Sequence, residues 1–177
     1  GVGFPAHLPG ETDTADGAAI TRESLLKVID EVHRCGGIAI PAHVDDESKG
    51  LLRLQADSKR CVLEAATVKL ALQAPGLLAL EWKACASTYP SIWDELKPTL
   101  ASVVGSDCHS FQGTAIPGSR YTWIKMARPS LEGLRLALLD GQEVSVRRSD
   151  ESDGFAPFNT PEHFIESIEI RDARYMG

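Results

Sequence analysis

The sequence predicts an α/β fold with mainly parallel strands. Two observations lead to this class. Short apolar runs rich in β-branched residues alternate with segments whose apolar residues recur at helical spacing, the pattern of repeated βα units. Glycine and proline separate most of these segments, as they do at the ends of regular elements. At 177 residues, the chain suits one domain, or one domain with a small appendage.

Composition excludes several classes of protein. The formal net charge of −7 argues against a general nucleic-acid-binding surface, although a small cationic patch remains compatible with it. Neither a signal peptide nor the roughly 20-residue apolar run of a membrane helix is present. The cysteines at 35, 61, 85 and 108 lie far apart without a CxxC pair, which predicts reduced thiols and a cytoplasmic protein. Because the chain starts at Gly1 without methionine, we expect a piece of a longer protein.

The first elements follow from local signals. Residues 1–19 have scattered glycine, proline and aspartate with no period, which predicts a loop. The segment 21–37 carries a helical apolar stripe, with Thr21 as a plausible N-cap and Gly36 as a stop. GGIAIPAH, residues 36–43, is a short β-branched run that predicts a buried strand.

The remaining segments continue the alternation. They predict a helix over 59–73, a strand over 77–82, a helix over 90–97, strands over 100–107 and 121–126, a helix over 129–141 and a strand over 143–148. The last helix opens with Pro129 and ends at Gly141, the usual asymmetry of helix termini. Residues 149–161 are dense in aspartate, glycine and proline, which predicts a linker, and HFIESIEIRDARYMG after it alternates weakly, as a strand does.

Three predicted strands end in groups that can bind metal. They deliver His43, then Glu81, then the pair Asp107 and His109. Because the carboxyl ends of parallel strands open onto one face, we expect these side chains to meet there. On an extended chain, Asp107 and His109 point to one side while Cys108 turns inward as a packed thiol. Imidazole together with carboxylate predicts a transition-metal site.

Simpler interpretations stand beside this one. Asp107 and Ser106 could form a polar turn that bonds only the local backbone. Glu81 could be a rim glutamate paired with Lys83 or with an arginine. Other imidazole and cationic residues are explained as structural, incidental or solvated: His33, His163, Arg147 and Arg148. His7 could reach the rim but is not counted among the ligands. Arg120, Lys125 and Arg128 follow the metal motif and could contact a phosphate, although solvated loop charges are the commoner case.

The motifs resemble a known family. GGIAIPAHVD together with GSDCHS is similar to the third and final motifs of the polymerase-and-histidinol-phosphatase (PHP) superfamily of metal-dependent phosphoesterases. GSRYTWIKMARPSLEGLRLALLDG is similar to the segment that follows the last metal motif in the TrlF family, in which a PHP domain is fused to an AAA-like, SMC-type ATPase. KGLL and LLALEWK fit the same subgroup, so the resemblance runs from Thr21 to Arg148.

The resemblance implies a fold and an activity. The fold is a distorted, seven-stranded β/α barrel with clustered divalent ions (manganese, zinc or iron) on its rim. The implied metal ligands are His43, Asp107, His109 and Glu81, and Asp107 and His109 are also the implied catalytic residues. The substrate is then nucleic acid or another phosphate ester, in an ATPase-coupled protein of DNA repair or defence.

The chain also departs from the family pattern. An upstream HxH, a motif ending in DH and a metal-bridging glutamate are missing. The resemblance therefore implies that residues 1–148 are the C-terminal portion of a barrel and supply only part of the metal shell. Residues 149–177 would be a linker and the first strand of an ATPase domain, and the chain contains no GxxxxGK[ST]. Alone, such a portion should be inactive, because part of the metal shell is missing. It should also be oligomeric or marginally stable, because sheet edges are exposed.

Two rival functions remain open. A PHP-like domain that has lost its metal ligands can persist as a structural or regulatory module docked on the ATPase. A second rival is a metal-dependent barrel hydrolase of the amidohydrolase kind, which usually adds a metal-ligating lysine or carbamate. No such lysine can be identified in this sequence.

Overall fold

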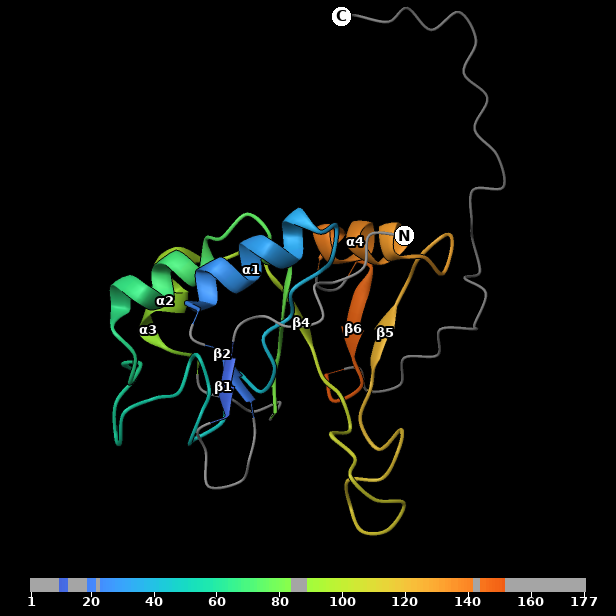
Figure 1. Ribbon diagram of the computed structural model, residues 1–177. Coiled ribbons are helices and arrows are strands. Elements are labelled where there is room, and N and C mark those ends of the chain that lie inside the picture. The colour runs from blue at the N-terminus through green and yellow to red at the C-terminus, as the bar shows by residue number, and fades with distance from the viewer. Residues whose placement is uncertain (1–9, 13–18, 22, 84–88, 142–143, 152–177) are drawn as a thin grey trace, which may run out of the picture.

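The computed structural model describes the chain apart from residues 1–9, 13–18, 22, 84–88, 142–143 and 152–177. Its elements, in chain order, are β1 (Gly10–Thr12), β2 (Ala19–Thr21), α1 (Leu25–Arg34), α2 (Ala65–Leu72), β3 (Ala79–Glu81), α3 (Ser91–Leu96), β4 (Ala101–Val103), β5 (Thr122–Ile124), α4 (Leu131–Asp140) and β6 (Val146–Arg148). The protein therefore belongs to the mixed α/β class. Figure 1 shows α1, α2 and α4 along one side of the molecule, with β4, β6 and β5 next to one another.

The strand pairings differ from the predicted parallel sheet. Strands β3 and β4 are parallel, with Ala79 opposite Ala101 and Glu81 opposite Val103. Strands β5 and β6 are antiparallel, as are β1 and β2. Strand β1 lies within the segment predicted as loop, and β2 begins at the last residue of that segment. Parallel pairing is thus confined to the centre of the fold, and the placed strands do not close into a barrel.

The predicted strand over 36–43 is only partly formed. Ala39 makes an isolated parallel bridge with Leu77, and the Pro41 carbonyl accepts a hydrogen bond from the Glu81 amide at 3.0 Å. Proline has no N–H to donate, so a regular ladder cannot continue through Pro41. The segment therefore lies beside β3 as extended chain, which is sufficient to carry His43 to the end of that strand.

Two predicted helix boundaries are wrong for local reasons. Helix α1 starts at Leu25 because Ser24, rather than Thr21, caps it, accepting from the Lys27 amide at 3.3 Å. Helix α2 starts at Ala65 rather than 59, because the preceding residues form a hairpin-like turn. In this turn the Val62 amide donates to the Arg53 carbonyl at 2.7 Å, which satisfies backbone groups that a helix would otherwise use.

The later helices lie within two residues of their predicted bounds, although α4 starts at Leu131 rather than at Pro129. Pro90 is the N-cap of α3, and Ser130 caps α4 by accepting from the Gly133 amide at 3.0 Å. Gly141 follows α4 with φ of 83°, a left-handed conformation that glycine adopts at little cost. Across the placed residues, no helix has the length and apolar character needed to cross a bilayer.

The core has two parts. The larger part packs α1, α2 and α3 around β3, and Trp82 lies within it at 1% exposure, edge-on to Tyr89 at 4.9 Å and to Trp93 at 5.6 Å. The smaller part joins α4 to β4 and β6 through Leu138 and Val146, both fully buried. These two clusters hold the strands whose ends carry the candidate site.

Arg148 is buried, which corrects its interpretation as a solvated strand end. Its side chain is 1% exposed and donates to both carboxylate oxygens of Asp150, from Nε at 2.9 Å and from Nη2 at 2.8 Å. Burial alone would lower the pKa of Arg148, but the hydrogen bonds to Asp150 and the charge of Glu151 raise it overall. A paired guanidinium is the form in which arginine can be buried.

Adjacent leucines of α4 provide a test of this packing. Leu138→Ala removes a fully buried side chain and should lower the free energy of unfolding by about 2–5 kcal/mol, because it leaves a cavity. Leu139→Ala is the matched control, since Leu139 is 61% exposed and should change stability by no more than about 0.5 kcal/mol. Urea unfolding followed by circular dichroism measures both. Equal losses at the two positions would contradict the described orientation of α4.

Candidate functional site

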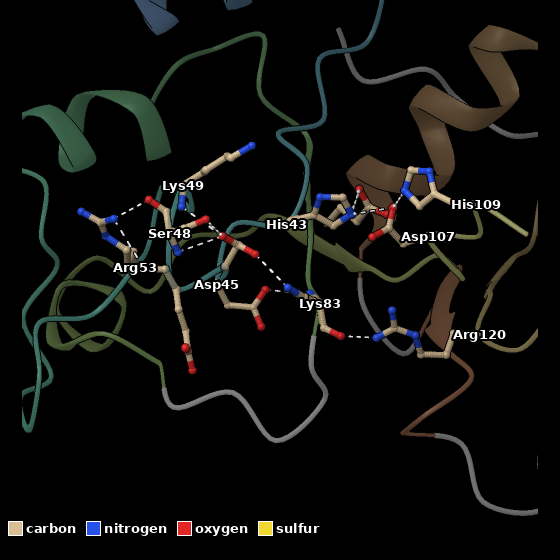
Figure 2. A network of polar contacts seen from close by, with 12 residues as sticks. His43, Asp45, Ser48, Lys49, Arg53, Lys83, Asp107, His109 and Arg120 are labelled. Carbon is tan, nitrogen blue, oxygen red and sulfur yellow. Dashed lines mark hydrogen bonds and ion pairs between the residues drawn. The ribbon is translucent and has the colours of Figure 1, made fainter. Parts of the chain in front are cut away.

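Four side chains predicted as metal ligands lie together at one edge of the central strands. Glu81 is the last residue of β3, and the loop after β4 carries Asp107 and His109. His43 follows the extended segment beside β3. Because β3 and β4 are parallel and adjacent, their carboxyl ends open onto the same edge, and Figure 2 shows His43 and His109 on either side of Asp107.

The polar atoms of these residues form a chain of close contacts. Asp107 Oδ1 is 3.5 Å from His43 Nε2 and 3.4 Å from His109 Nε2. Glu81 Oε2 lies 3.9 Å from His43 Nε2. Two ligands of one tetrahedral ion, each bonded at about 2.1 Å, are themselves about 3.4 Å apart. The contacts to Asp107 therefore have the spacing of atoms that share an ion.

The four side chains do not yet surround one point. Among the residues placed in the structure, no three His, Cys, Asp or Glu side chains form a group that could hold a metal ion as they stand. The contacts run in a line from Glu81 through His43 and Asp107 to His109, whose side chain is 90% exposed. The metal role of these residues therefore remains a prediction.

The backbone is unusual at two of these positions. His43 and Asp107 each have φ of 47°, in the left-handed region where residues other than glycine are uncommon. Such conformations cost energy and tend to cluster at functional sites. Gly105 also lies close to the site, because a Cβ there would be 3.0 Å from Glu81 Oε1. Two of the four candidate ligands, His43 and Asp107, thus have a backbone conformation that few residue types adopt readily.

An ion pair beside His43 was not predicted from the sequence. Lys83 Nζ donates to Asp46 Oδ2 at 2.8 Å. Asp46 Oδ1 also accepts from the Ser48 hydroxyl at 2.7 Å, the Ser48 amide at 2.9 Å and the Lys49 amide at 3.0 Å. The bond from Lys83, with those from Ser48 and Lys49, holds the pKa of Asp46 well below its ordinary range. In turn, Asp46 raises the pKa of Lys83.

Backbone bonds join the same two segments. The Lys83 amide donates to Asp45 Oδ1 at 2.6 Å, and the Val44 amide donates to the Glu81 carbonyl at 2.9 Å. A third segment joins them, because Arg120 donates to the Lys83 carbonyl. Lys83 thus pairs with Asp46, while the Glu81 carboxylate faces His43. The paired aspartates of AHVDDES were the available sequence signal, because aspartate commonly caps such turns.

Other predicted residues lie elsewhere. Cys108 is exposed, so its interpretation as a packed thiol is wrong; the left-handed Asp107 breaks the alternation on which it depended. Lys125 and Arg128 line a cavity of about 810 Å³ beside α4, away from the four candidate ligands. His7, Cys85 and His163 fall outside the described parts of the chain.

Comparison of the chain with protein-family models, curated proteins and solved structures finds no match. The functional interpretation therefore depends on the residues and contacts described above.

The depressed pKa of Asp46 predicts how its contribution to stability varies with pH. A carboxylate whose pKa is lower in the folded state contributes fully above its ordinary pKa, near 4, and loses that contribution as the pH falls further. The difference in unfolding free energy between the wild type and Asp46→Asn should therefore be constant from pH 5 to 8. It should shrink below about pH 4. Urea titrations across this range measure it.

The matched control is Asp57→Asn, which removes an exposed carboxylate from a turn where φ is 53°, a conformation that asparagine also tolerates. If Asp57→Asn and Asp46→Asn showed the same pH dependence, the effect would come from net charge rather than from the pair of Asp46 and Lys83.

Proposed function

We propose that this chain is part of a metal-dependent phosphoesterase domain of the PHP type. One observation supports the proposal: side chains of the types that bind metal come from three separate segments to one edge, with His43 and His109 within 3.5 Å of the same Asp107 oxygen. Imidazole and carboxylate are the donors that suit manganese, zinc and iron.

The donor types, imidazole and carboxylate, suit one divalent ion. Asp107, His43 and His109 would hold it, with Glu81 at the margin because of its 3.9 Å contact with His43. A bound ion would lower the pKa of a water molecule and neutralise charge on a phosphate ester. The chain's own residues would fix the position of the ion. Because the imidazoles must be neutral and the carboxylates ionised, metal binding should fail in acid.

The barrel and the domain order belong to the same proposal. Parallel pairing of β3 with β4, and the parallel bridge from Ala39 to Leu77, are consistent with the later strands of a β/α barrel. Residues 1–148 would form that portion, and 149–177 would lead to an ATPase domain of the same protein, working on DNA in repair or defence. Free thiols at Cys35, Cys61 and Cys108 are compatible with a cytoplasmic setting.

A non-catalytic module is the second candidate. It is favoured by the linear arrangement of the contacts and by the absence, among the described side chains, of a group able to hold an ion as it stands. In that case the domain would support or regulate the ATPase, and the site would be the remnant of a metal centre.

Activity assays separate these two functions. This chain alone should bind one divalent ion weakly and show negligible phosphoesterase activity, because three or four ligand atoms are too few to fix two ions. The intact parent protein should hydrolyse p-nitrophenyl phosphate esters or end-labelled DNA with added manganese. Asp107→Ala or His109→Ala in the parent should reduce hydrolysis to background without unfolding it, because each removes a ligand.

Cys108→Ala is the matched control, since this exposed thiol lies between the two ligands and should leave hydrolysis unchanged. Full activity in His109→Ala would contradict the proposed mechanism. A folded, metal-loaded but inactive parent would favour the non-catalytic module.

A further inference from the structure

Lys83 lies where three segments of the candidate site meet. Its amide donates to Asp45 Oδ1 at 2.6 Å and its ammonium to Asp46 Oδ2 at 2.8 Å. Its carbonyl accepts from Arg120, which lies beyond the loop that carries Asp107. Figure 2 shows these contacts side by side with His43. Lys83, two residues after β3, therefore contacts the turn that follows His43 and, through Arg120, the segment that precedes β5.

The turn attached to Lys83 is tightly built. Asp46 Oδ1 accepts from Ser48 and Lys49 inside this turn. At Gly50 a Cβ would lie 2.4 Å from the Val44 carbonyl oxygen, so the backbone closes on itself there. These bonds and the close backbone approach restrict the internal freedom of residues 44–50. Holding Asp45 and Asp46 in place therefore also constrains the preceding residue pair, Val44 and His43.

His43 needs such support. Its φ of 47° is a costly conformation that persists only where the surrounding structure over-determines it. On one side, the Val44 amide bonds the Glu81 carbonyl at 2.9 Å. On the other, the Pro41 carbonyl accepts from the Glu81 amide at 3.0 Å. Beyond these bonds, the turn is attached to the end of β3 through the two contacts from Lys83.

We propose that Lys83, through its ion pair with Asp46, is a positioning residue that sets where His43 lies relative to Glu81 and Asp107. The Lys83 ammonium is engaged by Asp46 rather than by the ligand cluster, so it acts through the turn. This inference rests on the proposed function, because the consequence of correct positioning is affinity for a divalent ion. Outer partners that orient metal ligands typically change metal affinity about 10- to 100-fold when they are removed.

The effect should be local rather than global. The Lys83 side chain is 54% exposed, and ion pairs at that exposure contribute little to overall stability. Substitution should therefore leave the unfolding midpoint close to that of the wild type while weakening the site. A residue with a merely structural role would lower stability first.

The test is a Mn²⁺ titration of the full chain, followed by the electron paramagnetic resonance signal of free Mn²⁺. Lys83→Met and Asp46→Asn should each raise the dissociation constant about 10-fold or more. The double variant should be no worse than either single variant, because both remove the same interaction. Lys83→Arg should restore most of the affinity. Lys69→Met, on the exposed side of α2, is the control for loss of one positive charge.

A metal-free readout accompanies the titration. The imidazole ¹H–¹⁵N signals of His43 should shift in Lys83→Met and return towards the wild-type position in Lys83→Arg. If Lys83→Met did not fold, Asp46→Asn would provide the same test from the other partner. Unchanged His43 signals and unchanged Mn²⁺ affinity in a folded Asp46→Asn would overturn the positioning role.

The two proposals fail differently. If His43→Ala and Asp107→Ala left Mn²⁺ affinity unchanged, the proposed function would fail, and with it the predicted effect of Lys83 on affinity. If both weakened binding but Lys83→Met did not, only the positioning role would be overturned. An equal loss in Lys69→Met and Lys83→Met would assign the effect to net charge and would also overturn it.

Discussion

The parallel register at the centre of the fold is the constraint on which the rest of the structure depends. Glu81 pairs with Val103 across β3 and β4, and the Glu81 amide and carbonyl bond the extended segment on its other side. Because these strands run in one direction, three chain segments end at one edge. A slip of one residue would turn Glu81 to the opposite face of the sheet and separate it from His43.

This arrangement concentrates negative charge. Asp45, Asp46, Glu81 and Asp107 come from segments that meet at the same edge, and neighbouring carboxylates repel one another when they are all ionised. Lys83 offsets part of that repulsion by bonding Asp46. A divalent cation held between Asp107 and the two histidines would offset more. The charges of this edge are thus compatible with the proposed metal role.

Local signals were sufficient for some elements and not for others. Pro90 and Gly141 mark α3 and α4 because helix ends depend on neighbouring residues. The start of α2 was predicted wrongly, because the apolar spacing of the residues before it is compatible with a hairpin as well as with a helix. The meeting of His43, Glu81, Asp107 and His109 followed from the rule for parallel strand ends. The contacts of Lys83 with Asp45 and Asp46 could not be predicted by this rule, because they join residues 38 and 37 positions apart in the sequence. The prediction that Cys108 is buried was wrong because the left-handed backbone of Asp107 interrupts the alternation of side chains along an extended strand.

The buried pair of Arg148 and Asp150 has a mechanical consequence. Arg148 closes β6, whose antiparallel partner β5 continues to Tyr121, where the Ser149 amide bonds the Tyr121 carbonyl at 2.9 Å. Tension on the chain beyond Glu151 would load these bonds together with the pair of Arg148 and Asp150, whose separation would leave the buried guanidinium without this partner. Pulling there should deform β5 and β6 as one body. The end of β6 is thus a stiff attachment point through which force reaches α4 and β4.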